Sequence, residues 1–174
     1  MEGNLIIVNI IKELLFDSSL CFITEEFDCY NNPITTIVTT EYTISYPMPC
    51  KQLLQIVLLL RGSNLKSSLQ TSKKILRKKK LVPILIDYQK KLVLLPVYPL
   101  RSKENTFYNP FNIITIKPVN NKQSNIIFKK GRSLVIPLSA NTIHKKQLHA
   151  QQLLNNITYY LNYPMNPDDF KPFL

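Results

Sequence analysis

The chain has 174 residues, of which 45% are hydrophobic and 19% charged, a composition typical of one folded domain and too apolar for a disordered chain. Its 22 lysines and arginines against 11 aspartates and glutamates leave a net charge of +11, which indicates an acidic partner. No apolar run approaches the roughly 18 to 20 residues that span a bilayer. Acidic residues surround the N-terminal apolar run, unlike a signal peptide, so we expect a cytoplasmic protein without a membrane partner.

The first third of the chain predicts strands followed by a buried helix. Residues 4–16 form an apolar run whose period fits a strand and a helix equally, so this segment remains unassigned. Residues 20–24 and 34–44 are rich in β-branched side chains and flank a turn, which predicts two strands. Leucines then recur almost all round residues 50–61, which predicts a buried helix that begins after Pro49 and ends at Gly62.

The middle of the chain predicts a basic amphipathic helix and a hairpin. Ser63 or Asn64 can cap a helix over residues 65–77, which has leucines on one side and bases on a neighbouring stripe. Residues 83–86 and 91–97 are β-type runs around a short turn, which predicts a hairpin. Three prolines then confine residues 98–111 to a loop or a sheet edge, because proline cannot donate to a sheet ladder.

The last third predicts a second hairpin and a closing helix. Residues 125–128 and 133–138 flank a turn in which Gly131 supplies the positive φ that a tight turn needs. Asn141 can cap a helix that continues to about Leu161. Its apolar stripe consists of Ala150, Leu153, Leu154, Ile157 and Leu161. We therefore expect an α+β fold with mixed hairpins and sheet, a basic central helix pair and a C-terminal helix, in one domain over residues 1–162. Prolines make residues 163–174 an irregular tail.

The positive charge is concentrated in the middle of the chain. Residues 1–50 carry one base and seven acids, whereas residues 51–150 carry 20 bases and two acids, a net charge of +18. An AT-rich genome can raise the lysine content everywhere, but it does not explain why the bases are missing from both ends. This asymmetry is typical of a surface that binds a polyanion, and it favours nucleic acid over a membrane surface or an acidic protein.

The sequence lacks the usual signatures of catalysis and of cofactor binding. His144 and His149 are spaced five residues apart, so on a helix they diverge and cannot share a metal ion. The glycines are isolated and form no phosphate loop, and Asp87 and Glu104 are the only acids of the basic segment. Three cysteines without CxxC spacing suggest neither a disulfide framework nor a zinc site and are most simply buried small residues. We expect a non-enzymatic protein without a cofactor.

Three groups of bases form the candidate DNA-binding site. Taken alone, each group would suit a solvated charged face, and their occurrence in one segment favours a binding surface. Lysine suits phosphate contact, whereas arginine suits base edges or a narrow minor groove, so Arg77 and Arg132 are the candidates for groove contacts. The candidates are Lys66, Lys73 and Lys74 on the helix, Arg77, Lys78, Lys79 and Lys80 after it, and Lys129, Lys130 and Arg132 at the second hairpin.

Several short motifs, in their order and spacing, resemble the ComK family of competence transcription factors. The first motifs are residues 54–57 (LQIV), 62–63 (GS), 73–75 (KKI), 83–85 (PIL) and 94–96 (LLP). The others are residues 126–134 (IIFKKGRSL) and 136–139 (IPLS). The resemblance extends over about residues 18–160. One departure is the absence of the tryptophan that the family carries near residues 107–113, where this chain has Phe107, Tyr108 and Phe111.

This resemblance implies a DNA-binding activator that switches on DNA-uptake genes. It implies recognition of paired AT-rich promoter boxes, largely through the minor groove, by a homodimer or a higher oligomer. RNA polymerase and a Clp-protease adaptor are the further partners that it implies. The family commonly extends further at its C-terminus, in a region tied to regulated proteolysis, whereas this sequence ends at Leu174. The alternative reading is an interaction module that uses the same basic face to bind an acidic protein or an anionic lipid.

Overall fold

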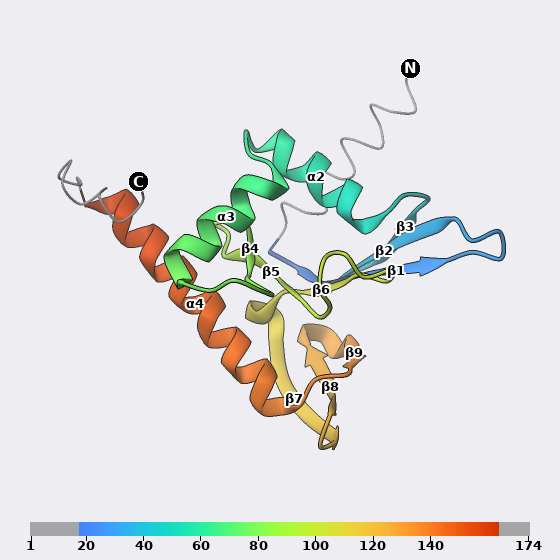
Figure 1. Ribbon diagram of the computed structural model, residues 1–174. Helices are drawn as coiled ribbons and strands as arrows, with labels where there is room; N and C mark the ends of the chain where they lie inside the picture. The colour runs from blue at the N-terminus through green and yellow to red at the C-terminus, as the bar shows by residue number, and fades with distance from the viewer. Residues whose placement is uncertain (1–17, 164–174) are drawn as a thin grey trace.

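The computed structural model describes residues 18–163, which form two antiparallel sheets and three α-helices (Figure 1). The strands of the larger sheet are β1 (Leu20–Phe27), β2 (Pro33–Thr39), β3 (Thr43–Tyr46), β4 (Ile84–Asp87), β5 (Leu92–Pro96) and β6 (Thr106–Tyr108). The smaller sheet consists of β7 (Ile113–Asn120), β8 (Gln123–Phe128) and β9 (Ser133–Ile136). The helices are α2 (Cys50–Leu60), α3 (Leu65–Leu76) and α4 (Ala140–Asn162), with short 3-10 turns at η1 (Pro110–Asn112) and η2 (Lys129–Gly131).

The six-stranded sheet lies at the centre of the fold, in the order β3-β2-β1-β6-β5-β4. Strand β5 is buried on both faces, which is why its apolar run is continuous. Side chains alternate along β5, so Leu92 and Leu94 join the core on one face while Val93 and Leu95 join the core on the other. The sheet therefore separates two hydrophobic cores.

Helices α2 and α3 cover one face of this sheet, and the smaller sheet together with α4 covers the other (Figure 1). Leu53, Leu54 and Val57 of α2 are fully buried in the first core. The prediction of a helix buried almost all round is wrong for its last turn, because Leu59 and Leu60 are exposed. In the second core, Phe128 of β8 packs on Phe22 of β1 with ring centroids 5.5 Å apart. The structure thus confirms the α+β class, the antiparallel hairpins and the C-terminal helix.

The segment over residues 34–44, predicted as one strand, contains two strands and a turn. Thr39 ends β2, and its hydroxyl accepts hydrogen bonds from the amides of Glu41 (3.2 Å) and Tyr42 (3.0 Å). This side-chain cap reverses the chain within the β-branched run and allows β3 to pair with β2. Threonine is common in strands, and its hydroxyl can also cap a turn. The composition of residues 34–44 therefore did not show that the strand ends at Thr39.

The assignment of residues 98–111 to a loop or a sheet edge is wrong for β6, which lies between β1 and β5 inside the larger sheet. The prolines flank these three residues instead of interrupting them. Buried asparagines on both sides connect β6 to β1, since the Asn105 amide donates to Glu25 (2.6 Å) and the Asn109 amide donates to the Leu20 carbonyl (3.1 Å). Strand β7, which follows, was also not predicted.

Smaller corrections concern α4 and one cysteine. The N-cap of α4 is Ser139, not Asn141, because the Ser139 hydroxyl accepts from the amide of Thr142 (3.3 Å). The predicted apolar stripe is buried as far as Leu154, whereas Leu161 is exposed. Cys29 is exposed, contrary to the expectation that all three cysteines are buried. The apolar run over residues 4–16 and the tail from residue 164 lie outside the described residues.

Candidate nucleic-acid interface

Helix α3 carries the first group of candidate bases on a well-defined local framework. The Asn64 side chain accepts from the amide of Ser67 (2.8 Å) and caps the helix, as one of the two predicted caps. Leu76 is buried, and Leu65 and Leu69 pack against the first core. This packing directs the opposite side of α3 to solvent. Lys66, Lys73 and Lys74 are all exposed there.

The second group projects from a fixed turn at the C-terminus of α3. Arg77 adopts the left-handed conformation (φ 51°), and the amide of Lys78 donates to the Lys73 carbonyl (3.1 Å). This hydrogen bond closes the helix end in the manner usual for glycine caps. Val82 is buried and anchors the far side of the turn. We call Lys66, Lys73, Lys74, Arg77, Lys78, Lys79 and Lys80 the α3 surface; all seven side chains are exposed.

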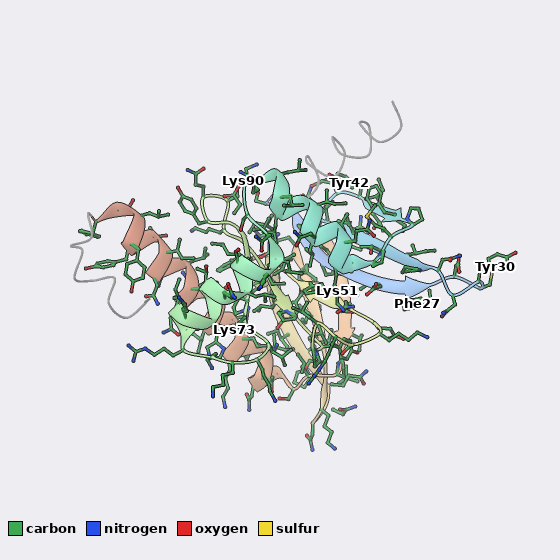
Figure 2. The ribbon with its side chains drawn as sticks, turned by 45° about the horizontal axis from the view of Figure 1, so that its top comes forward. Phe27, Tyr30, Tyr42, Lys51, Lys73 and Lys90 are labelled. Atoms are coloured by element: carbon green, nitrogen blue, oxygen red, sulfur yellow. The ribbon has the colours of Figure 1, made fainter. Side chains whose placement is uncertain are left out.

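Asp87 is the acidic residue nearest in sequence to the α3 surface, but its hydrogen-bond partners lie outside that surface. Its carboxylate accepts from the Arg61 guanidinium (2.6 Å) and from the backbone amides of Gln89 (2.9 Å) and Lys90 (3.2 Å). Asp87 is 7% exposed, so its charge is shielded from solvent. Lys90 follows Asp87, and Figure 2 shows Lys90 and Lys73 on opposite sides of α3. Lys73 of the α3 surface therefore lies apart from Lys90 in this view.

The third group, Lys129, Lys130 and Arg132, is docked on the β2–β3 turn. Lys130 forms an ion pair with Glu41, and the Arg132 Nε donates to the Thr39 carbonyl (3.2 Å). Lys129 is exposed. Because the smaller sheet covers one face of the larger sheet and α3 covers the other, this tip and the α3 surface belong to different layers. The structure does not bring the three groups into one patch.

Sequence reasoning missed three exposed bases that the structure places in informative positions. The β7–β8 turn forms the free end of the smaller sheet (Figure 1). Lys122 is exposed in this turn, and Lys117 is exposed on β7. Arg101, in the β5–β6 connection, lines a cavity together with Lys73, Lys79 and Lys80. Lys117 and Lys122 lie on a hairpin whose first strand was not predicted, and Arg101 is far from the α3 surface in sequence. The residues next to Lys117, Lys122 and Arg101 in the sequence therefore do not indicate where these bases lie in the fold.

We expect Gly131→Ala to lower the free energy of unfolding by about 1 kcal/mol. Gly131 has φ 77°, and an added Cβ would meet no atom within 4 Å, so the penalty is backbone strain alone. Urea unfolding monitored by circular dichroism measures it. Ser133→Ala, at the exposed start of β9, is the control and should leave the midpoint almost unchanged. An equal midpoint for Gly131→Ala and the parent would contradict the assigned turn.

The histidines and cysteines do not form a chemical centre. His144 is exposed beside Gln147, and burial together with the charges of Lys78 and Lys146 lowers the pKa of His149. Burial raises the pKa of the Cys21 thiol to about 11. Within residues 18–163, no three histidine, cysteine or acidic side chains gather as a metal site would require. In the same residues, no helix combines the length and apolarity needed to cross a membrane.

Comparison with known proteins supports the resemblance stated from the motifs. No curated protein and no solved structure matches the chain. Residues 14–160 match the family described as ComK protein, and this match covers most of the sequence, including both sheets, α2, α3 and nearly all of α4. The chain therefore belongs to the ComK family, a family of competence transcription factors rather than of enzymes.

Proposed function

We propose that this protein is a transcriptional activator that binds double-stranded DNA through the α3 surface. The observation that carries the proposal is the run of seven exposed bases on a capped helix and its fixed C-terminal turn. Lysine dominates this surface, and a lysine ammonium contacts phosphate as a point charge without reading bases. The proposed affinity is therefore largely electrostatic and dependent on salt.

AT-rich promoter boxes are the proposed targets. Their minor groove is narrow and has an enhanced negative potential that attracts basic side chains. Arg77 is the arginine of the α3 surface, held in a left-handed turn between lysines that would contact the flanking phosphates. The docked tip at Lys129, Lys130 and Arg132 is a second contact in this proposal, and it belongs to the opposite layer. Two contact surfaces on different layers suit a protein that binds paired boxes as an oligomer.

Titration of an AT-rich duplex and a GC-rich duplex at physiological salt tests this function. We expect tighter binding to the AT-rich duplex, and equal affinities would exclude the proposed preference. Capture of partners from lysate, with and without nuclease treatment, tests the binding class. Nuclease should release the partners, and an acidic protein retained after nuclease would favour an interaction module instead.

We expect Lys73→Ala to reduce the slope of log K against log salt by about 0.9, because loss of one phosphate contact means that fewer counterions are released on binding. Lys130→Ala should reduce the slope by less, because Lys130 is already paired with Glu41 in the free protein. Fluorescence anisotropy of a labelled duplex across a salt series measures the slope. Lys90→Ala is the matched control, since Lys90 lies on the other side of α3 from Lys73 (Figure 2). An unchanged slope for either variant would remove that lysine from the interface.

A further inference from the structure

A cavity of about 410 Å³ lies between α3, the α3–β4 connection and the β5–β6 connection. This volume is within the range of roughly 300 to 1,000 Å³ that is usual for small-molecule sites. Its walls come from three separate parts of the chain, so the fold itself creates it. Binding of duplex DNA does not require a cavity of this size. We therefore consider a small molecule as its ligand.

Four cationic side chains line the cavity, and no acidic residue does. Lys73 comes from α3, Lys79 and Lys80 from the following connection, and Arg101 from the β5–β6 connection. A fifth positive charge lies behind the wall, because Lys146 donates to the carbonyl of Pro96 (2.7 Å), and Pro96 also lines the cavity. Lys146 is 8% exposed, and within residues 18–163 no carboxylate pairs with it. This concentration of charge favours a ligand group with more than one negative charge, such as a phosphate.

The remaining wall of the cavity is apolar. It is formed by Leu69, Leu81, Val82, Pro96, Pro99 and Leu100. Leu81 has φ 49°, a conformation rarely adopted by leucine, and this backbone keeps its side chain at the cavity while Val82 is buried behind it. Inorganic phosphate would fill only part of this volume and would leave the apolar wall uncovered. A flat ring attached to a phosphate matches both walls.

We propose that this cavity binds a nucleotide, with the phosphate on Lys73, Lys79, Lys80 and Arg101 and the base on the leucine and proline wall. The same chemistry is available from a free nucleotide and from DNA. The apolar wall beside the cations favours the free nucleotide, because the bases of a duplex are stacked inside it and do not reach such a wall. Three of the four cations belong to the α3 surface. A bound nucleotide therefore competes with DNA for them, and this competition rests on the proposed function.

Isothermal titration of the full chain without DNA tests the site directly, with AMP, ADP, adenosine and inorganic phosphate as probes. AMP and ADP should bind at least fivefold more tightly than either adenosine or inorganic phosphate, because only the nucleotides reach both walls. Arg101→Gln should weaken ADP binding at least fivefold. Lys117→Gln removes an equal charge from exposed β7 and should leave ADP binding unchanged.

Two other results would contradict the nucleotide site. Equal affinities for phosphate and ADP, or equal effects of the two variants, would overturn the nucleotide site and leave a general cationic surface. If ADP does not bind while Arg101→Gln weakens duplex binding, the cavity receives a DNA phosphate and the free-nucleotide proposal fails. Binding of the parent chain to duplex DNA is measured separately, so failure of the nucleotide site is distinguishable from failure of the proposed function. Where the function holds, ADP should also displace a labelled duplex at constant ionic strength.

Discussion

Replacing Lys78, Lys79 and Lys80 together by glutamine should lower the affinity for an AT-rich duplex about a hundredfold at physiological salt, if each lysine contacts one phosphate. A phosphate contact that releases about 0.9 counterions contributes roughly fivefold to binding at this salt concentration, and three contacts multiply. The slope of log K against log salt should fall by about 2.7 in the same variant. Anisotropy titrations at several salt concentrations measure both quantities.

The matched control removes the same number of positive charges elsewhere. Lys51, Lys90 and Lys91 lie outside the α3 surface, so their triple replacement by glutamine keeps the net charge equal to that of the first variant. We expect this control to change the affinity by no more than about threefold, since charges outside the binding surface are screened by salt. An equal loss in both variants would show that net charge alone drives binding, and the α3 surface would then not be the interface.

The fold of the variants needs its own measurement. Lys78, Lys79 and Lys80 are exposed, and their side chains contribute no burial to either core. Glutamine is neutral and flexible, so the urea midpoint should stay close to that of the parent. A large drop in the midpoint would mean that the affinity is lost because the variant unfolds. The affinities of the three single variants would then be measured instead.

Local signals explain which parts of the fold the sequence predicted. Helix α3 follows from its cap at Asn64 and its leucine spacing, and the β8–β9 turn follows from Gly131. These features depend on residues within a few positions of one another. The same is true of Lys66 and Lys73, because they lie on a stripe beside the buried leucines of α3.

Partners distant in sequence explain what the sequence did not predict. Strand β6 is short, and its place in the sheet depends on Asn105 and Asn109, whose partners Glu25 and Leu20 belong to β1, about 80 to 90 residues earlier in the chain. Likewise, nothing near Lys130 indicates that Glu41 will pair with it. The cavity at Arg101 forms only when the β5–β6 connection returns beside α3. The sequence therefore showed which segments are basic, but it could not show which of these bases lie together in the fold.

Lys146→Met should raise the free energy of unfolding by about 2 kcal/mol at pH 7, because it removes a buried charge that the fold does not neutralise. Burial lowers the pKa of Lys146 from 10.5 to about 8. The folded chain therefore holds this proton less tightly than the unfolded chain, and the difference corresponds to about 3 kcal/mol. Losing the hydrogen bond to the Pro96 carbonyl offsets about 1 kcal/mol of the gain.

The sign of the pH dependence follows from the lowered pKa. Below pH 8, Lys146 is charged in both states, and the folded state carries the whole penalty. Between pH 8 and 10.5 the folded lysine loses its proton while the unfolded lysine keeps it, so the parent gains stability as the pH rises. The advantage of Lys146→Met should thus be largest at pH 7 and disappear by about pH 10.

Urea unfolding of the parent and the variant at pH 7 and pH 10 measures this difference, and Lys145→Met is the control. Lys145 is the exposed neighbour on α4, so its replacement should give the same stability change at both pH values. A lower stability of Lys146→Met at pH 7 would mean that the folded protein stabilises this ammonium. Since Pro96 also lines the cavity at Arg101, Lys146→Met should weaken ADP binding while it stabilises the fold. Opposite changes in stability and binding would indicate a buried charge that is retained for an anion.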